Sequence, residues 1–134
     1  MEARRGWTGL RGLFGTGAAV VIATVVVAVR DPHVLGSYGF CPLYLVTGLY
    51  CPACGALRAT HDLAHLDLAA AWSQNALWVL VAPAVVIGWA ALVVRRLRGL
   101  PSRPLPVWLG WAGLALVATF GILRNLPPFA VLSP

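Results

Sequence analysis

Three long uncharged runs of apolar residues limit what this chain can fold into. They cover about residues 13–29, 76–94 and 105–123. A bilayer core of about 30 Å needs roughly 20 apolar residues in a helix, so each run is close to the length of one crossing. Only 10% of the 134 residues are charged, whereas a typical soluble domain has about 25%. We therefore expect an all-α membrane protein with about three transmembrane helices, forming a single membrane domain over residues 1–134.

The first run also has features of a secretory signal peptide, because arginines precede it. Its length and the lack of a small-x-small cleavage site favour a helix that stays in the membrane. Most tryptophans lie near the ends of the runs, as the aromatic belts of membrane proteins require. Trp89 is the exception, since it lies inside the second run.

The arginines are distributed unevenly around the runs. Seven precede the first run or separate the second from the third, namely Arg4, Arg5, Arg11, Arg95, Arg96, Arg98 and Arg103. Three lie on the other side, namely Arg30, Arg58 and Arg124. Cytoplasmic loops carry the excess of basic residues, so we expect a bacterial cytoplasmic membrane protein with a cytoplasmic amino terminus and an extracytoplasmic carboxyl terminus. The expected partners are the lipid bilayer and other membrane proteins. Nucleic acid is not expected, because no basic face interleaved with aromatic residues accompanies the arginines.

The connection between the first two runs, about residues 40–75, holds most of the reactive side chains. It contains all three cysteines, two of the three histidines and two of the four acidic residues. The same charge bias places this connection outside the cytoplasm. Much of the stretch from Cys41 to Tyr50 is apolar, so we expect a helical segment that lies in the interface or re-enters the bilayer.

Short motifs follow one another through this connection: Cys-Pro, Thr-Gly, Cys-Pro-Ala-Cys-Gly, an arginine, an aspartate and an asparagine. Their residues are Cys41, Pro42, Thr47, Gly48, Cys51, Pro52, Cys54, Gly55, Arg58, Asp67 and Asn75. The series resembles a family of small bacterial membrane proteins known as domain of unknown function 2752. Three positions depart from the family pattern: Leu57 replaces a threonine, Leu66 a glycine and Ala76 a proline. The resemblance implies a membrane architecture and assigns no activity.

The Cys51-Pro-Ala-Cys54-Gly55 sequence has the spacing of a metal-binding knuckle. Two thiolates two residues apart can chelate one tetrahedral ion such as zinc, and a following glycine permits a positive φ. Cys41 is the candidate third ligand. His61 or His65 is the candidate fourth, because residues four apart share one face of a helix. This pattern predicts an accessory membrane protein whose knuckle binds a zinc-like ion or otherwise staples the loop.

Two other interpretations of the cysteines stay open. Cys51 and Cys54 could form a redox pair, with Cys41 resolving it, because disulfides persist outside the cytoplasm. The protein would then be a membrane thiol-disulfide oxidoreductase. Alternatively the cysteines are only structural, and the chain is an interaction subunit of a membrane complex. The sequence shows no nucleophile-base pair, phosphate loop or cofactor fingerprint, so we do not predict an enzyme.

The polar residues after the cysteines predict a helix over about residues 56–72 with one polar stripe. Arg58 and Asp62 are four apart on it, so the arginine could pair with Asp62 or with Asp67. A solvated interfacial face is the simpler interpretation of this stripe. Asn75 precedes the second apolar run, where asparagine commonly caps a helix.

Overall fold

The computed structural model describes residues 2–34, 36–101 and 104–133, without the side chains of residues 2–10 and 130. Of the arginines used to predict the orientation, Arg103 and the side chains of Arg4 and Arg5 lie outside the described part. No strand occurs among the described residues, which confirms the all-α prediction. The elements are α1 (Glu2–Val29), α2 (Pro42–Thr47), α3 (Ala56–Ala64), α4 (Leu68–Leu97), α5 (Val107–Leu123) and the 3-10 helix η1 (Pro127–Leu132).

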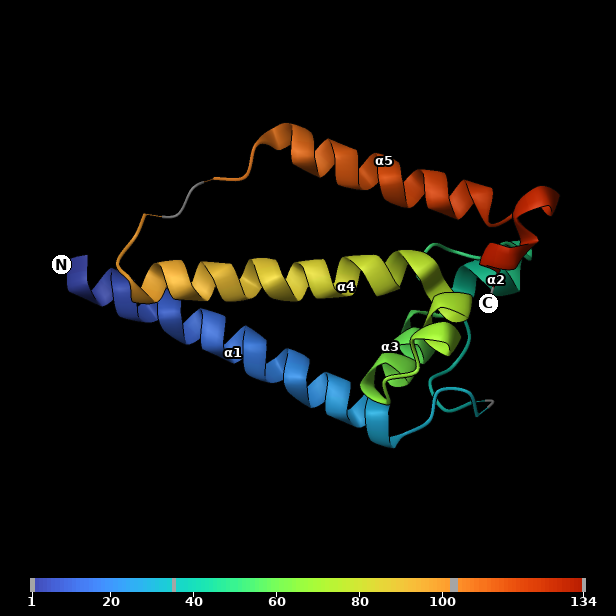
Figure 1. Cartoon of the computed structure of the whole chain (residues 1–134), viewed down its shortest axis with the longest axis horizontal. Coiled ribbons are helices and arrows are strands. Elements are labelled where there is room, and N and C mark those ends of the chain that lie inside the picture. Colours follow the sequence, from blue (N-terminus) through green and yellow to red (C-terminus); the bar gives the residue numbers. More distant parts are fainter. Residues whose placement is uncertain (1, 35, 102–103, 134) are drawn as a thin grey trace.

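The three long helices extend along the long axis of the molecule (Figure 1), and α4 runs opposite to α1 and α5. The arginines Arg95, Arg96 and Arg98 therefore lie at one end of the molecule, which we call the arginine end. The helices α2 and α3 lie at the opposite end. We call this the cysteine end, because Cys41, Cys51 and Cys54 all flank these two helices.

Two helices are long and apolar enough to cross a membrane, over Arg11–Val29 and Leu68–Leu97. Only 6% of the apolar window of each is buried inside the molecule. The core helix of a soluble protein would be mostly buried, so these exposed apolar helices are compatible with a lipid bilayer. The helix α5 has 17 residues and no buried side chain, and at 1.5 Å per residue it is roughly 25 Å long. It is the shorter apolar helix that corresponds to the third run.

The long helix α4 is interrupted at Asn75, whose backbone is extended rather than helical (φ −161°, ψ 93°). The Asn75 Oδ1 accepts the backbone N–H of Trp78 at 2.9 Å, which is the bond of an asparagine cap. The apolar run 76–94 is therefore the second part of a helix that starts at Leu68. The side chain of Asp67 caps that start by accepting the N–H of Ala70 at 2.9 Å.

The prediction of a single helix over residues 56–72 is wrong, because two helices occupy this stretch. The first, α3, ends at Ala64, and Leu66 then adopts a left-handed conformation with φ +62°. That reversal separates α3 from α4, so the two helices pack against each other instead of continuing in one direction. Both α3 and α4 also contact α1.

Candidate metal centre

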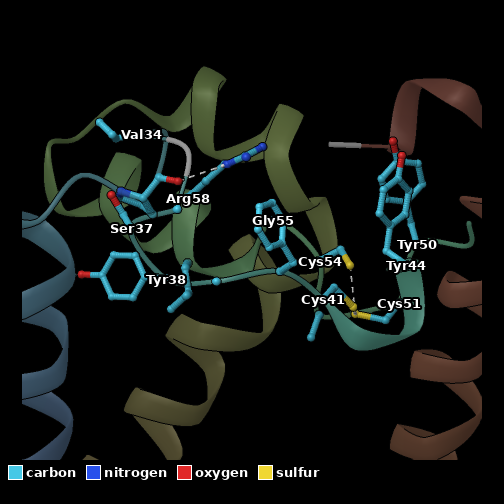
Figure 2. Close-up of a pocket in the computed structure, with 16 residues that line it drawn as sticks. Val34, Ser37, Tyr38, Cys41, Tyr44, Tyr50, Cys51, Cys54, Gly55 and Arg58 are labelled. Carbon is cyan, nitrogen blue, oxygen red and sulfur yellow. Dashed lines mark hydrogen bonds between the residues drawn. The ribbon is translucent and has the colours of Figure 1, made fainter. Parts of the chain in front are cut away.

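The three cysteines converge at the cysteine end from two separate segments. Cys41 precedes α2, whereas Cys51 and Cys54 belong to the turn between α2 and α3. The Sγ atoms of Cys51 and Cys54 are 3.0 Å apart, those of Cys41 and Cys51 are 3.5 Å apart, and all three lie within 4.8 Å of one another (Figure 2). All three are free thiols. Sulfur atoms about 2.3 Å from a tetrahedral zinc ion are about 3.8 Å apart, so the 3.0 Å and 3.5 Å separations are somewhat shorter than those of a zinc-bound set.

Two glycines with positive φ reverse the chain so that the cysteines meet. Gly48 has φ +71° and ends α2, where its N–H donates to the carbonyl of Tyr44. Gly55 has φ +81° and immediately precedes α3. Residues with a side chain rarely adopt this conformation. Between them, the N–H of Cys54 donates to the Cys51 carbonyl at 3.0 Å and closes the knuckle turn.

Two buried side chains, Asn75 and Arg124, donate hydrogen bonds to the backbone of the turn, and each is only 1% exposed. The Asn75 Nδ2 donates to the carbonyls of Pro52 at 2.9 Å and Cys54 at 3.0 Å. The Arg124 Nη1 donates to the carbonyls of Cys51 at 2.9 Å and Cys54 at 3.1 Å. Asn75 therefore joins the knuckle to the break in α4, and Arg124 joins it to the end of α5.

The same end of α5 makes two more contacts with the knuckle. The Asn125 side chain accepts the Tyr50 N–H at 2.8 Å and donates to the Tyr50 carbonyl at 2.8 Å. It therefore pairs with both backbone polar groups of Tyr50, as the backbone of a neighbouring β-strand does. A Cβ atom added to Gly121 would lie 3.3 Å from the Pro52 ring. Because glycine has no side chain, α5 can approach the Cys-Pro turn this closely.

The thiols differ in their affinity for a proton. The backbone N–H of Tyr44, followed by the thiols of Cys54 and Cys51, lowers the pKa of Cys41 to about 7. Burial raises the pKa of Cys54 to about 12, and the neighbouring thiols of Cys51 and Cys41 act in the same direction. Several negative charges therefore cannot accumulate here without a cation. A bound metal ion supplies that charge and deprotonates its thiol ligands.

A cavity of about 490 Å³ opens beside the cysteines (Figure 2). All three cysteines line it, together with Arg58 and the stacked rings of Tyr44 and Tyr50, whose centroids are 4.8 Å apart. The Arg58 Nε is 3.5 Å from the carbonyl of Pro32 and donates to it. Arg58 forms no ion pair with Asp62 or Asp67 in the described part of the chain.

The two candidate histidine ligands lie elsewhere, with His61 inside α3 and His65 directly after its last residue. The Nδ1 of His61 bonds to the carbonyl of Val27 at 2.9 Å, and the Nδ1 of His65 bonds to the carbonyl of His61 at 2.8 Å. His61 groups with Asp31 and His33, and none of the described histidines joins the three cysteines.

Arg124 and Asn125 were not singled out from the sequence as site residues. Arg124 was counted only as a charge that helps to orient the chain in the membrane. A local pattern cannot find these two residues, because the hydrogen bonds to the knuckle span 70 to 75 positions. The available signal was an arginine directly followed by an asparagine at the end of an apolar run.

Comparison with known families adds one result. Residues 41–89 match the family model described as a protein of unknown function, DUF2752. The chain resembles DUF2752 over this stretch. The match covers the cysteines, α3 and much of α4, and it confirms the resemblance drawn from the short motifs. Arg124 and Asn125 lie outside the part that matches DUF2752. No curated protein and no solved structure matches the chain.

Proposed function

We propose that this chain is a membrane protein that binds a zinc-like ion through the thiolates of Cys41, Cys51 and Cys54. The observation that carries the proposal is the convergence of all three Sγ atoms within 4.8 Å. Two cysteines suffice for a disulfide or a redox pair, and neither role requires the third. A tetrahedral soft-ligand site uses all three.

The buried positive charge of Arg124 also supports a metal centre made of thiolates, because such a centre is negatively charged. Three thiolates around a divalent ion carry a net charge of minus one, and the guanidinium of Arg124 balances it. The Arg124 Nε and Nη2 atoms are buried and have no hydrogen-bond partner among the described residues. A buried arginine is stable when an anionic group lies close to it. Thiolates bound to a metal are such a group.

The fourth coordination position distinguishes this site from a closed structural zinc site. Closed sites have four protein ligands, whereas the described part of the chain brings only three cysteines together. All three line the cavity of about 490 Å³. We infer that the fourth ligand comes from the cavity, either as water or as a donor atom of a molecule or partner protein that enters it.

The arginine bias supports an orientation with the cysteine end outside the cytoplasm and with the amino terminus and the arginine end inside. In this orientation the protein is an accessory component of a bacterial cytoplasmic membrane that presents a metal centre at its outer surface. The apolar surfaces of α1, α4 and α5 lie in lipid.

Metal analysis of the purified full chain tests the proposal. Cys51→Ser removes one thiolate and should lower the zinc content by one equivalent per chain relative to wild type. Ala53→Ser is the matched control, because it adds a hydroxyl to the same turn and keeps every thiol. Equal zinc in Cys51→Ser and wild type would overturn the proposal.

Thiol-disulfide exchange is the second candidate, favoured by the 3.0 Å between the Cys51 and Cys54 Sγ atoms. The Cys51 thiolate would attack a disulfide in a substrate protein and form a mixed disulfide, releasing one substrate thiolate. The Cys54 thiolate would then displace the second substrate thiolate and close a Cys51–Cys54 disulfide. The two cysteines are oxidised by two electrons and the substrate is reduced. Thiol labelling before and after reductant, on protein kept from air, reports this disulfide directly.

A further inference from the structure

A second group of metal-ligand side chains lies where the end of α1 meets α3. Asp31 and His33 follow α1, and His61 belongs to α3. One ligand atom from each of the three residues lies within 4.8 Å of the other two. The Asp31 Oδ1 is 2.8 Å from the His33 Nδ1 and 3.9 Å from the His61 Nε2. This group shares no residue with the three cysteines.

The hydrogen bond of His61 fixes which of its nitrogens is available. Its Nδ1 lies 2.9 Å from the carbonyl of Val27, and a carbonyl only accepts, so the Nδ1 carries the proton. The lone pair of the neutral ring is therefore on Nε2, the atom that faces Asp31. Metal-binding histidines characteristically donate their other ring N–H to a carbonyl or carboxylate in this way.

A buried carboxylate lies beside the group. The side chain of Asp62 is only 8% exposed, and its Oδ1 lies 3.6 Å from the His33 Nε2. Its Oδ2 is buried without a hydrogen-bond partner in the described part of the chain. Burying an ionised carboxylate is costly unless a positive charge lies near it. A divalent ion held by the neighbouring side chains would supply that charge.

We propose that Asp31, His33 and His61 bind a second divalent transition-metal ion, with Asp62 as the neighbouring carboxylate. A tetrahedral ion with nitrogen and oxygen ligands at 2.0–2.1 Å separates those ligands by about 3.3 Å. The observed 2.8 Å and 3.9 Å bracket this value. Imidazole and carboxylate ligands suit Zn²⁺, Cu²⁺ or Ni²⁺, whereas the three thiolates form a softer site. The ion would tie the segment after α1 to α3.

Equilibrium dialysis of the purified full chain against Zn²⁺, followed by metal analysis, tests this second site. We expect His61→Ala to bind one equivalent fewer than wild type. The matched control is His65→Gln, which replaces the histidine directly after α3 and outside the ligand group; it should keep the wild-type zinc content. A His61→Ala protein with the wild-type zinc content would overturn the proposal.

Asp31→Asn provides a variant that does not endanger folding, because the Asp31 side chain is 47% exposed. It should weaken Zn²⁺ binding at the second site at least tenfold, and an unchanged affinity would contradict the proposal. Substitutions at one site should leave metal binding at the other site unchanged, so the two proposals are tested separately. Cys51→Ser removes an equivalent that His61→Ala retains, and Co²⁺ shows a thiolate charge-transfer band only at the cysteines. A band that survives in His61→Ala while one equivalent is lost supports two independent sites.

Discussion

Arg124 combines a buried positive charge with direct hydrogen bonds to the knuckle. It is 1% exposed, and its Nη1 donates to the carbonyls of Cys51 and Cys54. Its guanidinium carbon lies 5.1 Å from the centre of the Phe120 ring and 5.9 Å from that of Tyr50. These aromatic faces stabilise a cation that has left water. Arg124 therefore fixes the shape of the turn, and in the proposed metal centre it would also offset the charge of the thiolates.

Replacing Arg124 tests this double role. We expect Arg124→Gln to weaken zinc binding about 10- to 100-fold, because it removes a supporting contact and the compensating charge. Arg124→Lys keeps the charge but not the planar fork, so its affinity should fall between those of wild type and Arg124→Gln. A competition titration with a zinc chelator measures the three affinities. Arg98→Gln, at the arginine end, is the control, and identical affinities for all four proteins would contradict the role of Arg124.

Leu66 has an uncommon backbone conformation for a residue with a side chain. Its φ of +62° is left-handed, and it is 86% exposed, so its side chain has little packing to lose. The family resembled by this chain has glycine at the equivalent position, and the left-handed turn between α3 and α4 gives a physical reason. A left-handed residue other than glycine costs about 1–2 kcal/mol.

Leu66→Gly should therefore stabilise the protein, by about 1 kcal/mol after the larger entropy of the unfolded glycine chain is subtracted. Thermal unfolding in detergent, followed by helicity, measures the change. Leu66→Ala is the control, since it shortens the side chain and keeps the strain. Equal stabilisation by alanine and by glycine would contradict backbone strain at Leu66.

At the scale of elements, α1 and α4 meet through a glycine and a tryptophan. A Cβ atom added to Gly17 would fall against the ring of Trp89. This contact explains why Trp89 lies inside an apolar run, away from the helix ends favoured by the other tryptophans. The ring fills the space beside a residue with no side chain, as small residues permit between membrane helices.

Gly17→Val should force α1 and α4 apart and lower the free energy of unfolding by about 1–3 kcal/mol. The matched control is Gly15→Val on the same helix, where an added Cβ meets nothing within 4 Å. Unfolding of both variants in the same detergent gives the comparison. Equal stabilities for Gly17→Val and Gly15→Val would show that the two helices do not pack through this contact.

The helices and their apolar character follow from residue patterns that are local. The runs 13–29, 76–94 and 105–123 all fall within observed helices or extend them by two residues, because uncharged apolar stretches of this length have few alternatives. The break at residues 65–67 was not predicted. The polar residues keep helical spacing across this break, so the pattern indicates one continuous helix. The left-handed position is occupied by Leu66 and not by glycine, the residue that usually indicates such a turn.

For the whole molecule, the sequence predicted that three cysteines would gather and did not predict what surrounds them. The Cys-Pro-Ala-Cys-Gly spacing fixes two thiols and the glycine that follows them. Position along the chain cannot show that α5 returns to the same end, where Arg124 and Asn125 close the knuckle. The four-residue spacing of His61 and His65 predicts that one of them joins the cysteines, whereas the structure places His61 beside the end of α1.

The molecule as a whole places its reactive side chains at one end and a cluster of arginines at the other. The thiols, the histidine group and the buried Arg124 lie around the cysteine end, whereas Arg95, Arg96 and Arg98 lie at the other end of α4. The three long apolar helices join these ends. The cysteine knuckle, which is the proposed metal centre, is held at one end of this scaffold by contacts from α4 and from the end of α5.

The most direct test counts protected thiols on single chains. Protein half-loaded with zinc is treated briefly with an alkylating reagent, and the labels on each intact chain are counted by mass spectrometry. If one ion binds all three sulfur atoms, chains carry either three labels or none, and Cys41 is protected together with Cys51 and Cys54. A zinc-loaded population that carries one label at Cys41 would contradict the three-thiolate centre.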